Sequence, residues 1–285
     1  MATIGISLGA LALAGLYHFQ TSIIYPANLG DSRTNCPTPD QYEMPYELVN
    51  LKTEDGETLQ CYSLKHDSKS SNYSNKTVLI LCPNAGNIGF ALPIVALFYR
   101  QFKYNVFIYS YRGYGKSTGK PSEIGLKIDA DRVMKYLCEE DEQFSKSSLI
   151  LYGRSLGSAV GIYIASKMPS AVDAIILENA FLSIKKTIPH IFPFLKYFTM
   201  FVHQHWESEK LVPKIPANIP VLLLSARQDE IVPPEHMDVI FDLLNSDVKQ
   251  MYKFEDSSHN DTVAQERYWE YIHEFIKENV NPIGL

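Results

Sequence analysis

The stretch SSLILYGRSLGSAVGIYIASKM, residues 147–168, is the most informative part of this 285-residue sequence. It starts with an apolar run typical of a buried strand, passes through Gly-x-Ser-x-Gly at 153–157, and continues as a helical run of small and apolar residues. A serine placed in this way predicts a nucleophile elbow, a strained turn that lifts the serine oxygen above a sheet. The N-terminus of the following helix also favours negative charge there. Ser155 is therefore the candidate nucleophile.

Short runs rich in Val, Ile and Leu recur on both sides of this stretch, with longer amphipathic segments between them. Near-continuous apolar runs are typical of strands covered on both faces, and their alternation with helices predicts a mostly parallel, doubly wound α/β sheet. Two segments joined by a turn at Asp55-Gly56 predict an antiparallel hairpin that precedes the parallel strands in the chain. The hairpin strands are 46–53 and 57–64, the other predicted strands are 77–82, 105–111, 147–152, 173–178, 220–225 and 248–254, and the helices include 122–140, 235–245 and 261–279. Asp261 or Thr262 is the expected cap of the last helix.

A catalytic acid and base are expected farther along the chain, because a serine hydroxyl is a weak nucleophile until a base accepts its proton. In this architecture the order is Ser, Asp or Glu, His, with each residue just after a later strand. Asp229 follows strand 220–225 and His259 follows strand 248–254. Asp229 would hold the imidazole in the correct tautomer and stabilise its charged form. Glu230 is the alternative acid.

An oxyanion hole needs two hydrogen-bond donors. One is expected to be the main-chain N–H of Leu156, directly after the nucleophile. The second is expected from the loop CPNAGNIG (82–89), which follows the third strand. Pro83 has no N–H, so either Asn84 or Ala85 is the expected donor.

The N-terminus has the composition of a membrane segment. From Ala2 to Gly30 there is no Asp, Glu, Lys or Arg, and residues 4–24 are almost entirely apolar. About twenty such residues can span a bilayer as one helix. We predict a single-pass anchor at 1–25 and a proline-containing connector at 26–45. A cleaved signal peptide and a helix packed on the domain are the alternatives.

Several other classes of function do not fit the sequence. A net charge of −6 argues against a nucleic-acid partner. The four cysteines have no metal-binding spacing, so no metal site is expected and the thiols are expected to be reduced. The segment SYRGYGKSTGKPSE (110–123) resembles half of a phosphate-binding loop, but Ser110 stands where the first glycine is required. The helix is expected only near Ser122, so we predict no nucleotide, and Arg112 is expected to pin the loop by an ion pair.

Several motifs together resemble the membrane-anchored α/β-hydrolases of the fungal bud-emergence family, relatives of the animal α/β-hydrolase-domain proteins. The motifs are NAGN (84–87), YRGYGKSTGKPSE (111–123), GRSLG (153–157), DEIVPP (229–234) and SHNDT (258–262). The resemblance covers nearly everything from residue 20 onward and implies Ser155, Asp229 and His259 as the triad. The family loop usually has His-Gly before Asn-Ala-Gly-Asn, where this chain has Cys82 and Pro83.

The expected protein is thus an α/β-hydrolase domain at 46–285, with an apolar insertion at 179–219 that either caps the site or packs on the sheet. The expected activity is hydrolysis of an ester or thioester in a lipid-like or acylated substrate, with no cofactor. A catalytically silent membrane scaffold and a serine peptidase are the alternatives. Asn260 lies in an N-glycosylation sequon beside His259, which favours a cytosolic catalytic domain.

Overall fold

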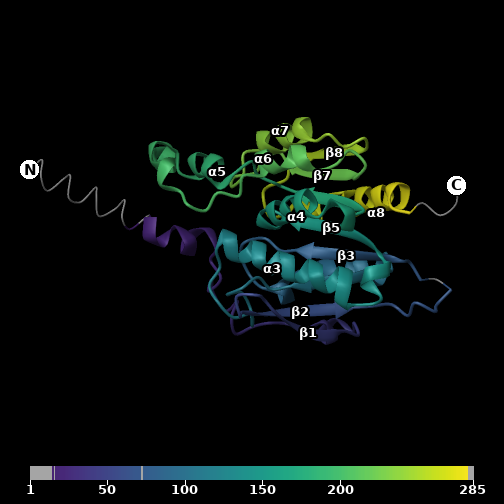
Figure 1. The fold of residues 1–285 in the computed structure, drawn as a ribbon. Helices are drawn as coiled ribbons and strands as arrows, with labels where there is room; N and C mark the ends of the chain where they lie inside the picture. Colours follow the sequence, from purple (N-terminus) through teal and green to yellow (C-terminus); the bar gives the residue numbers. More distant parts are fainter. Residues whose placement is uncertain (1–14, 16, 72, 282–285) are drawn as a thin grey trace, which may run out of the picture.

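The computed structural model describes residues 15, 17–71 and 73–281, and these residues form an eight-stranded sheet packed with helices (Figure 1). The strand order is β1-β2-β4-β3-β5-β6-β7-β8. β1, β2 and β4 pair antiparallel, and every other neighbouring pair is parallel. The strands are β1 (Glu47–Lys52), β2 (Thr58–Leu64), β3 (Lys76–Leu81), β4 (Asn105–Tyr109), β5 (Ser148–Arg154), β6 (Ala174–Glu178), β7 (Val221–Ala226) and β8 (Lys249–Phe254). The predicted hairpin and the mostly parallel sheet are both confirmed.

The central strands are almost continuously apolar in sequence because they are buried on both faces. Every residue of β4, β6 and β7 is buried, as expected for strands with helices on both faces. The edge strand β1 is mostly exposed, and β8 at the other edge is mostly half-buried. The core therefore lies along the central parallel strands, whose carboxyl ends carry the loops described below.

The helices cover the sheet and are α2 (Leu92–Ala96), α3 (Glu123–Lys135), α4 (Leu156–Lys167), α5 (Ile184–Ile191), α6 (Ser208–Leu211), α7 (Glu235–Leu243) and α8 (Tyr268–Asn279). Nine of the twelve residues of α4 are buried, so this helix lies inside the domain rather than on its surface. Helix α3 begins where the sequence predicts, because the Ser122 hydroxyl accepts a hydrogen bond from the Gly125 N–H.

The last helix begins later than predicted, at Tyr268 instead of near residue 261. The predicted caps serve the preceding loop: Asp261 accepts a hydrogen bond from the Ser258 N–H, and the Thr262 hydroxyl accepts one from the Asn179 side chain. Residues 262–264 form a single 3₁₀ turn instead. The prediction that either residue caps the helix is wrong, because the Asp261 side chain bonds the loop just before it and the Thr262 side chain bonds Asn179.

Most of the predicted membrane anchor, residues 1–14 and 16, lies outside the described residues. Residues 17–24 are helical, and no helix in the described part of the chain is long and apolar enough to cross a membrane. The connector that follows packs against the domain, because the Asn87 side chain donates to the carbonyl oxygens of Ser32 and Asn35. The Tyr62 hydroxyl likewise donates to the Pro37 carbonyl.

Candidate active site

The turn that carries Ser155 has the strained geometry of an elbow. Ser155 has φ 52° and ψ −113°, a conformation that few residues other than glycine adopt. Its N–H donates to the carbonyl of Glu178 on the neighbouring strand, at 2.9 Å. A Cβ added to Gly157 would lie 2.0 Å from the Leu81 carbonyl oxygen. Glycine is therefore required where α4 passes the end of β3.

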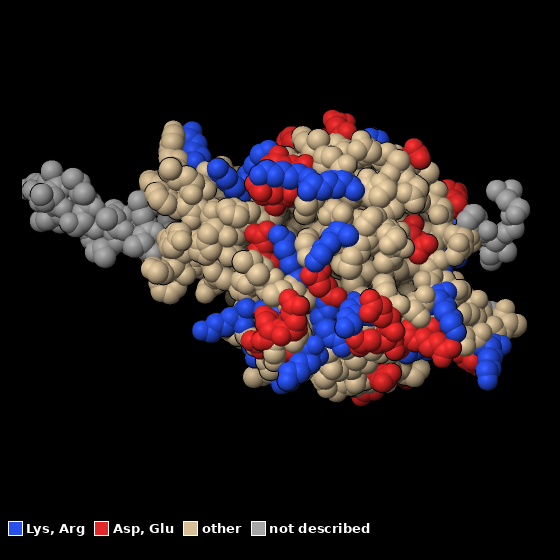
Figure 2. All heavy atoms as spheres, viewed as in Figure 1, with Lys and Arg blue, Asp and Glu red and all other residues tan. Residues whose placement is uncertain are grey.

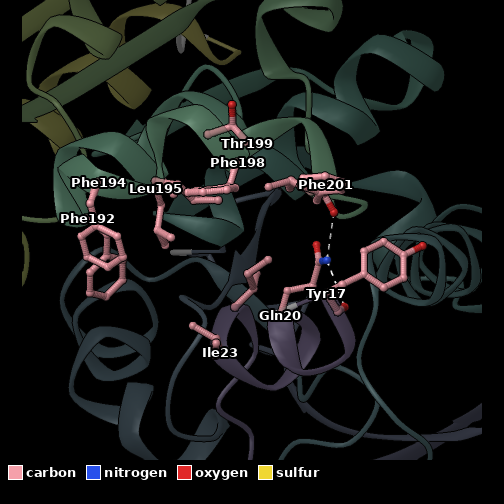
Figure 3. A pocket seen from close by; sticks show the side chains of 12 residues that line it. Tyr17, Gln20, Ile23, Phe192, Phe194, Leu195, Phe198, Thr199 and Phe201 are labelled. Atoms are coloured by element: carbon pink, nitrogen blue, oxygen red, sulfur yellow. Dashed lines mark hydrogen bonds between the residues drawn. The ribbon is translucent and has the colours of Figure 1, made fainter. Parts of the chain in front are cut away.

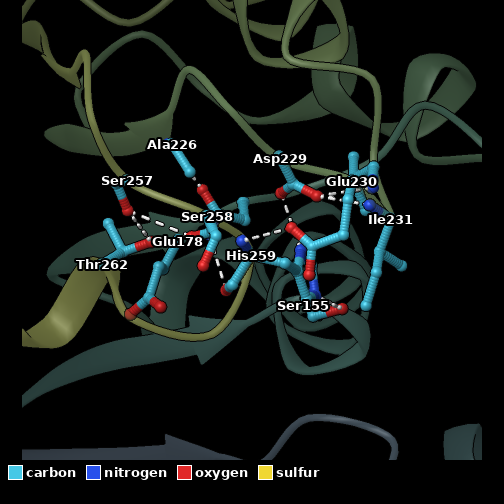
Figure 4. Close-up of polar contacts among 12 residues, drawn as sticks. Ser155, Glu178, Ala226, Asp229, Glu230, Ile231, Ser257, Ser258, His259 and Thr262 are labelled. Atoms are coloured by element: carbon cyan, nitrogen blue, oxygen red, sulfur yellow. Dashed lines mark hydrogen bonds and ion pairs between the residues drawn. The ribbon is translucent and has the colours of Figure 1, made fainter.

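The structure brings together the three residues that the sequence places after β5, β7 and β8 (Figure 4). The Nε2 atom of His259 lies 3.0 Å from the Oγ atom of Ser155, and its Nδ1 atom lies 2.6 Å from Oδ2 of Asp229. All three follow carboxyl ends of parallel strands, which meet at one edge of the sheet. Asp229 and His259 are both buried, so the pair is shielded from bulk water.

Asp229, and not Glu230, contacts the imidazole. One Asp229 oxygen, Oδ1, accepts the main-chain N–H groups of Ile231 and Val232, at 2.8 and 2.7 Å. This leaves Oδ2 facing the ring. Glu230 instead accepts the main-chain N–H of His259, at 3.1 Å. The geometry favours Asp229 over the alternative acid that the sequence left open.

Asn179, which the sequence analysis did not identify, joins the two loops of the site. Its side-chain nitrogen donates to the His259 carbonyl, at 3.1 Å, and to the Thr262 hydroxyl, at 2.9 Å. Its side-chain oxygen accepts the N–H of Ala226, at the end of β7. The available signal was its position directly after the predicted strand 173–178, where polar side chains reach the site edge.

Close relatives share this chain almost from end to end. An uncharacterized membrane protein of Saccharomyces cerevisiae is 48% identical over 273 residues, covering 96% of this chain and 94% of its own length. Protein bem46 of Schizosaccharomyces pombe is 42% identical over 281 residues, covering 98% and 92%. The chain belongs to the bud-emergence family. The resemblance read from the motifs is confirmed.

More distant similarities place this bud-emergence protein among α/β-hydrolases. The family model described as serine aminopeptidase, S33, matches residues 78–217. An esterase of Pyrococcus furiosus superposes with a TM-score of 0.72 at 20% identity, over 86% of this chain and 95% of that one. An α/β-hydrolase of Vibrio vulnificus gives 0.73 at 20%, over 91% and 93%. At such low identity these structures establish the α/β-hydrolase fold alone.

Beneath the elbow of this family member lies a buried carboxyl group, that of Glu178, which the sequence analysis also missed. Its Oε1 atom accepts from the Arg154 guanidinium at 3.0 Å, and its Oε2 atom accepts from the hydroxyls of Tyr152 and Tyr268. Burial raises the pKa of both phenols well above their usual range, so they remain protonated donors. Because the Glu178 carbonyl also accepts the Ser155 N–H, this network fixes the elbow from below.

The predicted oxyanion loop is held on two sides. The Asn84 carbonyl accepts from the Tyr114 hydroxyl at 2.8 Å, and its side-chain nitrogen donates to the carbonyl of Ile24 at 2.9 Å. The side chain of Asn84 is therefore engaged by the end of the N-terminal helix, which leaves only its main chain for a catalytic role. Leu156 is buried at the first position of α4. Both oxyanion assignments, and the choice between Asn84 and Ala85, stay predictions.

The insertion after β6 contacts the loop that carries Asp229. It consists of α5, the 3₁₀ segment η7 (Pro193–Phe201) and the short helix α6. The Nε2 atom of His190, on α5, lies 3.1 Å from the main-chain oxygen of Asp229. Two residues earlier on the same helix, Ile188 lines an apolar groove. One short helix thus contributes to both the groove and the support of the triad.

That groove lies between the insertion and the helix at residues 17–24, and its volume is about 250 Å³ (Figure 3). Its lining is almost wholly aliphatic and aromatic. Gln20 joins the two walls, because its side chain donates to the Phe201 carbonyl at 3.2 Å and accepts the His203 N–H at 2.9 Å. The insertion and the N-terminal helix therefore form one surface.

The loop at 110–123 has a structural role. Arg112 is buried, its Nε atom lies 2.8 Å from Asp129, and its terminal nitrogens contact Asp55. The Lys116 ammonium donates to the Arg33 carbonyl at 3.3 Å. The expected ion pair therefore has two acidic partners, and the lysine contacts main chain. Among the described residues, no group of three or more His, Cys, Asp or Glu side chains could hold a metal ion.

Proposed function

We propose that this chain is a membrane-anchored serine hydrolase that cleaves ester or thioester bonds of lipid-like or acylated substrates. The observation that carries the proposal is the contact chain from Ser155 Oγ through His259 to Asp229, with distances of 3.0 and 2.6 Å at a strained elbow. The elbow geometry and both hydrogen bonds are those that activate a serine for nucleophilic attack.

The reaction proceeds through an acyl-enzyme. The Oγ atom of Ser155 attacks the substrate carbonyl carbon while His259 Nε2 accepts the hydroxyl proton. The N–H of Leu156 and a second N–H from Asn84 or Ala85 stabilise the tetrahedral oxyanion. His259 then protonates the leaving alcohol or thiol, and Ser155 remains acylated. Water attacks the acyl-enzyme with His259 again as the base, which releases the acid. These steps use neither a metal nor a cofactor.

Two observations support an acyl substrate held at a membrane. The groove beside the insertion is apolar and lined by aromatic and aliphatic side chains, which suits a hydrocarbon chain. The N-terminal residues Ala2 to Gly30 carry no Asp, Glu, Lys or Arg, and the Saccharomyces cerevisiae relative is described as a membrane protein. We place the catalytic domain on the cytosolic side, because a glycan on Asn260 would lie next to His259.

Labelling with a fluorophosphonate probe tests the proposal. The wild-type chain is expected to be labelled and the Ser155→Ala variant is not. Absence of labelling in a folded wild type would refute a serine hydrolase and leave the silent scaffold.

A serine peptidase is the second candidate, because the family model over residues 78–217 is described as a serine aminopeptidase. Acyl thioesters, p-nitrophenyl esters of increasing chain length and aminoacyl p-nitroanilides separate the two candidates. We expect turnover of the thioesters or esters to exceed that of the anilides and to increase with acyl length. Preference for the anilides would establish the peptidase.

A further inference from the structure

The insertion exposes large apolar side chains that its own packing leaves uncovered. Phe194, Tyr197 and Met200, here called the rim, are 68, 72 and 74% exposed. All three belong to η7, none of whose residues is buried. Monomeric soluble proteins rarely expose contiguous apolar surface of this kind, and where they do it marks an interaction site.

The rim continues onto the N-terminal helix. Phe19 and Ile23 are 65 and 56% exposed, and Ile23 and Phe194 both line the groove between the two segments (Figure 3). Gln20 binds the main chain on both sides of residue 202. Two segments nearly 180 residues apart in sequence thus form one apolar face at one end of the molecule (Figure 1).

The insertion's part of this face is basic, although the whole chain carries −6. Residues 179–206 include no Asp or Glu, and three lysines lie among them. Lys186 pairs with Glu209, whereas Lys185 and Lys196 are exposed at the edge of the face. In Figure 2 this end of the molecule is mostly tan, while red side chains gather over the body. Apolar side chains flanked by lysines are the pattern that binds anionic lipid surfaces.

The N-terminal segment of the chain is joined to this apolar face. The 14 residues before Gly15 carry no Asp, Glu, Lys or Arg, and they join the helix at 17–24 beside the rim. A bilayer that holds this segment therefore lies directly against the rim. A second protein copy would need a complementary face, and nothing in the charge pattern favours one.

We infer that the rim inserts into the interfacial layer of the leaflet that holds the N-terminal segment, with Lys185 and Lys196 at anionic headgroups. The groove then opens toward the acyl chains, so a substrate chain enters it from the bilayer. The inference rests on the proposed membrane attachment and does not depend on the chemistry at Ser155.

The test uses the full chain bound to vesicles of phosphatidylcholine and phosphatidylserine. An environment-sensitive dye is attached at Tyr197→Cys, or at the control Leu48→Cys on the exposed edge strand β1. Cys36 and Cys138, the two cysteines that are not buried, are replaced by serine. Lipids brominated in their acyl chains are expected to quench the dye at 197 and to leave the dye at 48 unaffected.

Each other result overturns the inference. If the protein binds vesicles but the dye at 197 is not quenched, the anchor binds the membrane and the rim does not insert. Equal quenching at both positions indicates unspecific adsorption. Self-quenching between dyes at 197, without lipid quenching, would assign the rim to a second copy. A chain that does not float with the vesicles refutes the anchor as well. Fluorophosphonate labelling of the same samples reports separately on the hydrolase.

Discussion

Replacement of Asp229 by asparagine tests how the base is oriented. The oxygen Oδ1 accepts two main-chain N–H groups, from Ile231 and Val232. In the Asp229→Asn variant the amide oxygen must take that place, since the NH₂ group cannot accept. The NH₂ group then faces Nδ1 of His259, where Oδ2 lies 2.6 Å away in the wild type. Nδ1 has to accept, so the ring proton moves to Nε2 and points at Ser155.

A base with its proton already on Nε2 cannot take another from the serine. We expect the rate of serine acylation to fall about 10⁴-fold, equivalent to roughly 5 kcal/mol of transition-state stabilisation. The assay is the second-order rate of fluorophosphonate labelling, together with kcat/KM for a p-nitrophenyl ester. Thermal unfolding of the variant verifies that it folds.

Glu230→Gln is the matched control, one residue along and with the same change of charge. Within the described part of the chain, the hydrogen bond of the Glu230 side chain is to the main-chain N–H of His259, and glutamine retains an acceptor there. We expect less than about a tenfold loss, the size of one weakened neutral hydrogen bond. A loss below tenfold in Asp229→Asn, or a comparable loss in both variants, would refute the assignment of Asp229.

Three further changes test the scaffold. Gly157→Ala places a Cβ 2.0 Å from a carbonyl oxygen of β3, so we expect loss of cooperative thermal unfolding. Asp129→Asn leaves the buried Arg112 guanidinium short of a charged partner, and urea unfolding should show a loss of about 3 kcal/mol. Burial lowers the pKa of His236 to about 4, whereas an unfolded chain takes up that proton near pH 6.5. Stability should therefore fall as the pH drops from about 6.5 to about 4, and less steeply in His236→Gln.

Neighbouring positions provide the controls. At Gly161 an added Cβ would meet two leucine methyl groups, at 3.3 and 3.9 Å, and no backbone, so Gly161→Ala should unfold cooperatively. Asp131 pairs with the exposed Lys167, and Asp131→Asn should cost less than about 1 kcal/mol. Equal losses at residues 129 and 131 would contradict the argument from burial. An unchanged pH slope in His236→Gln would contradict the argument from its pKa.

The sheet could be predicted because its information is local. A strand covered on both faces needs apolar residues throughout, so β4, β6 and β7 are visible in the sequence itself. Their exact ends are not, because distant contacts set them. The fourth strand was predicted to residue 111 but ends at Tyr109. At the next pair of residues, Ser110 donates its N–H to the Gln60 carbonyl, but the return bond is replaced by Ser117. The Ser117 hydroxyl accepts the Gln60 N–H and donates to the Ser110 carbonyl.

The three residues proposed as the triad could be placed together from the sequence for a related reason. Each directly follows a strand, and parallel strands bring their carboxyl ends to one edge whatever the loops contain. Glu178 and Asn179 also stand at the end of a strand, yet their roles depend on partners that no local pattern indicates. Arg154 lies 24 residues before Glu178 in the sequence and Tyr268 lies 90 residues after it.

The second donor of the oxyanion hole is harder to predict from the sequence than the triad. The sequence predicts Asn84 or Ala85, but the group proposed to act there is a main-chain N–H, which every residue except proline possesses. The side chain of Asn84 binds the carbonyl of Ile24, so its identity is explained by the N-terminal helix and not by the oxyanion. That contact links the segment proposed to lie in the membrane to the loop proposed to stabilise the transition state. The N-terminal helix therefore contacts the oxyanion loop directly through Asn84, and it also reaches the insertion through Gln20. A displacement of this helix would act on the oxyanion loop and, through His190 on the insertion, on the main chain of Asp229.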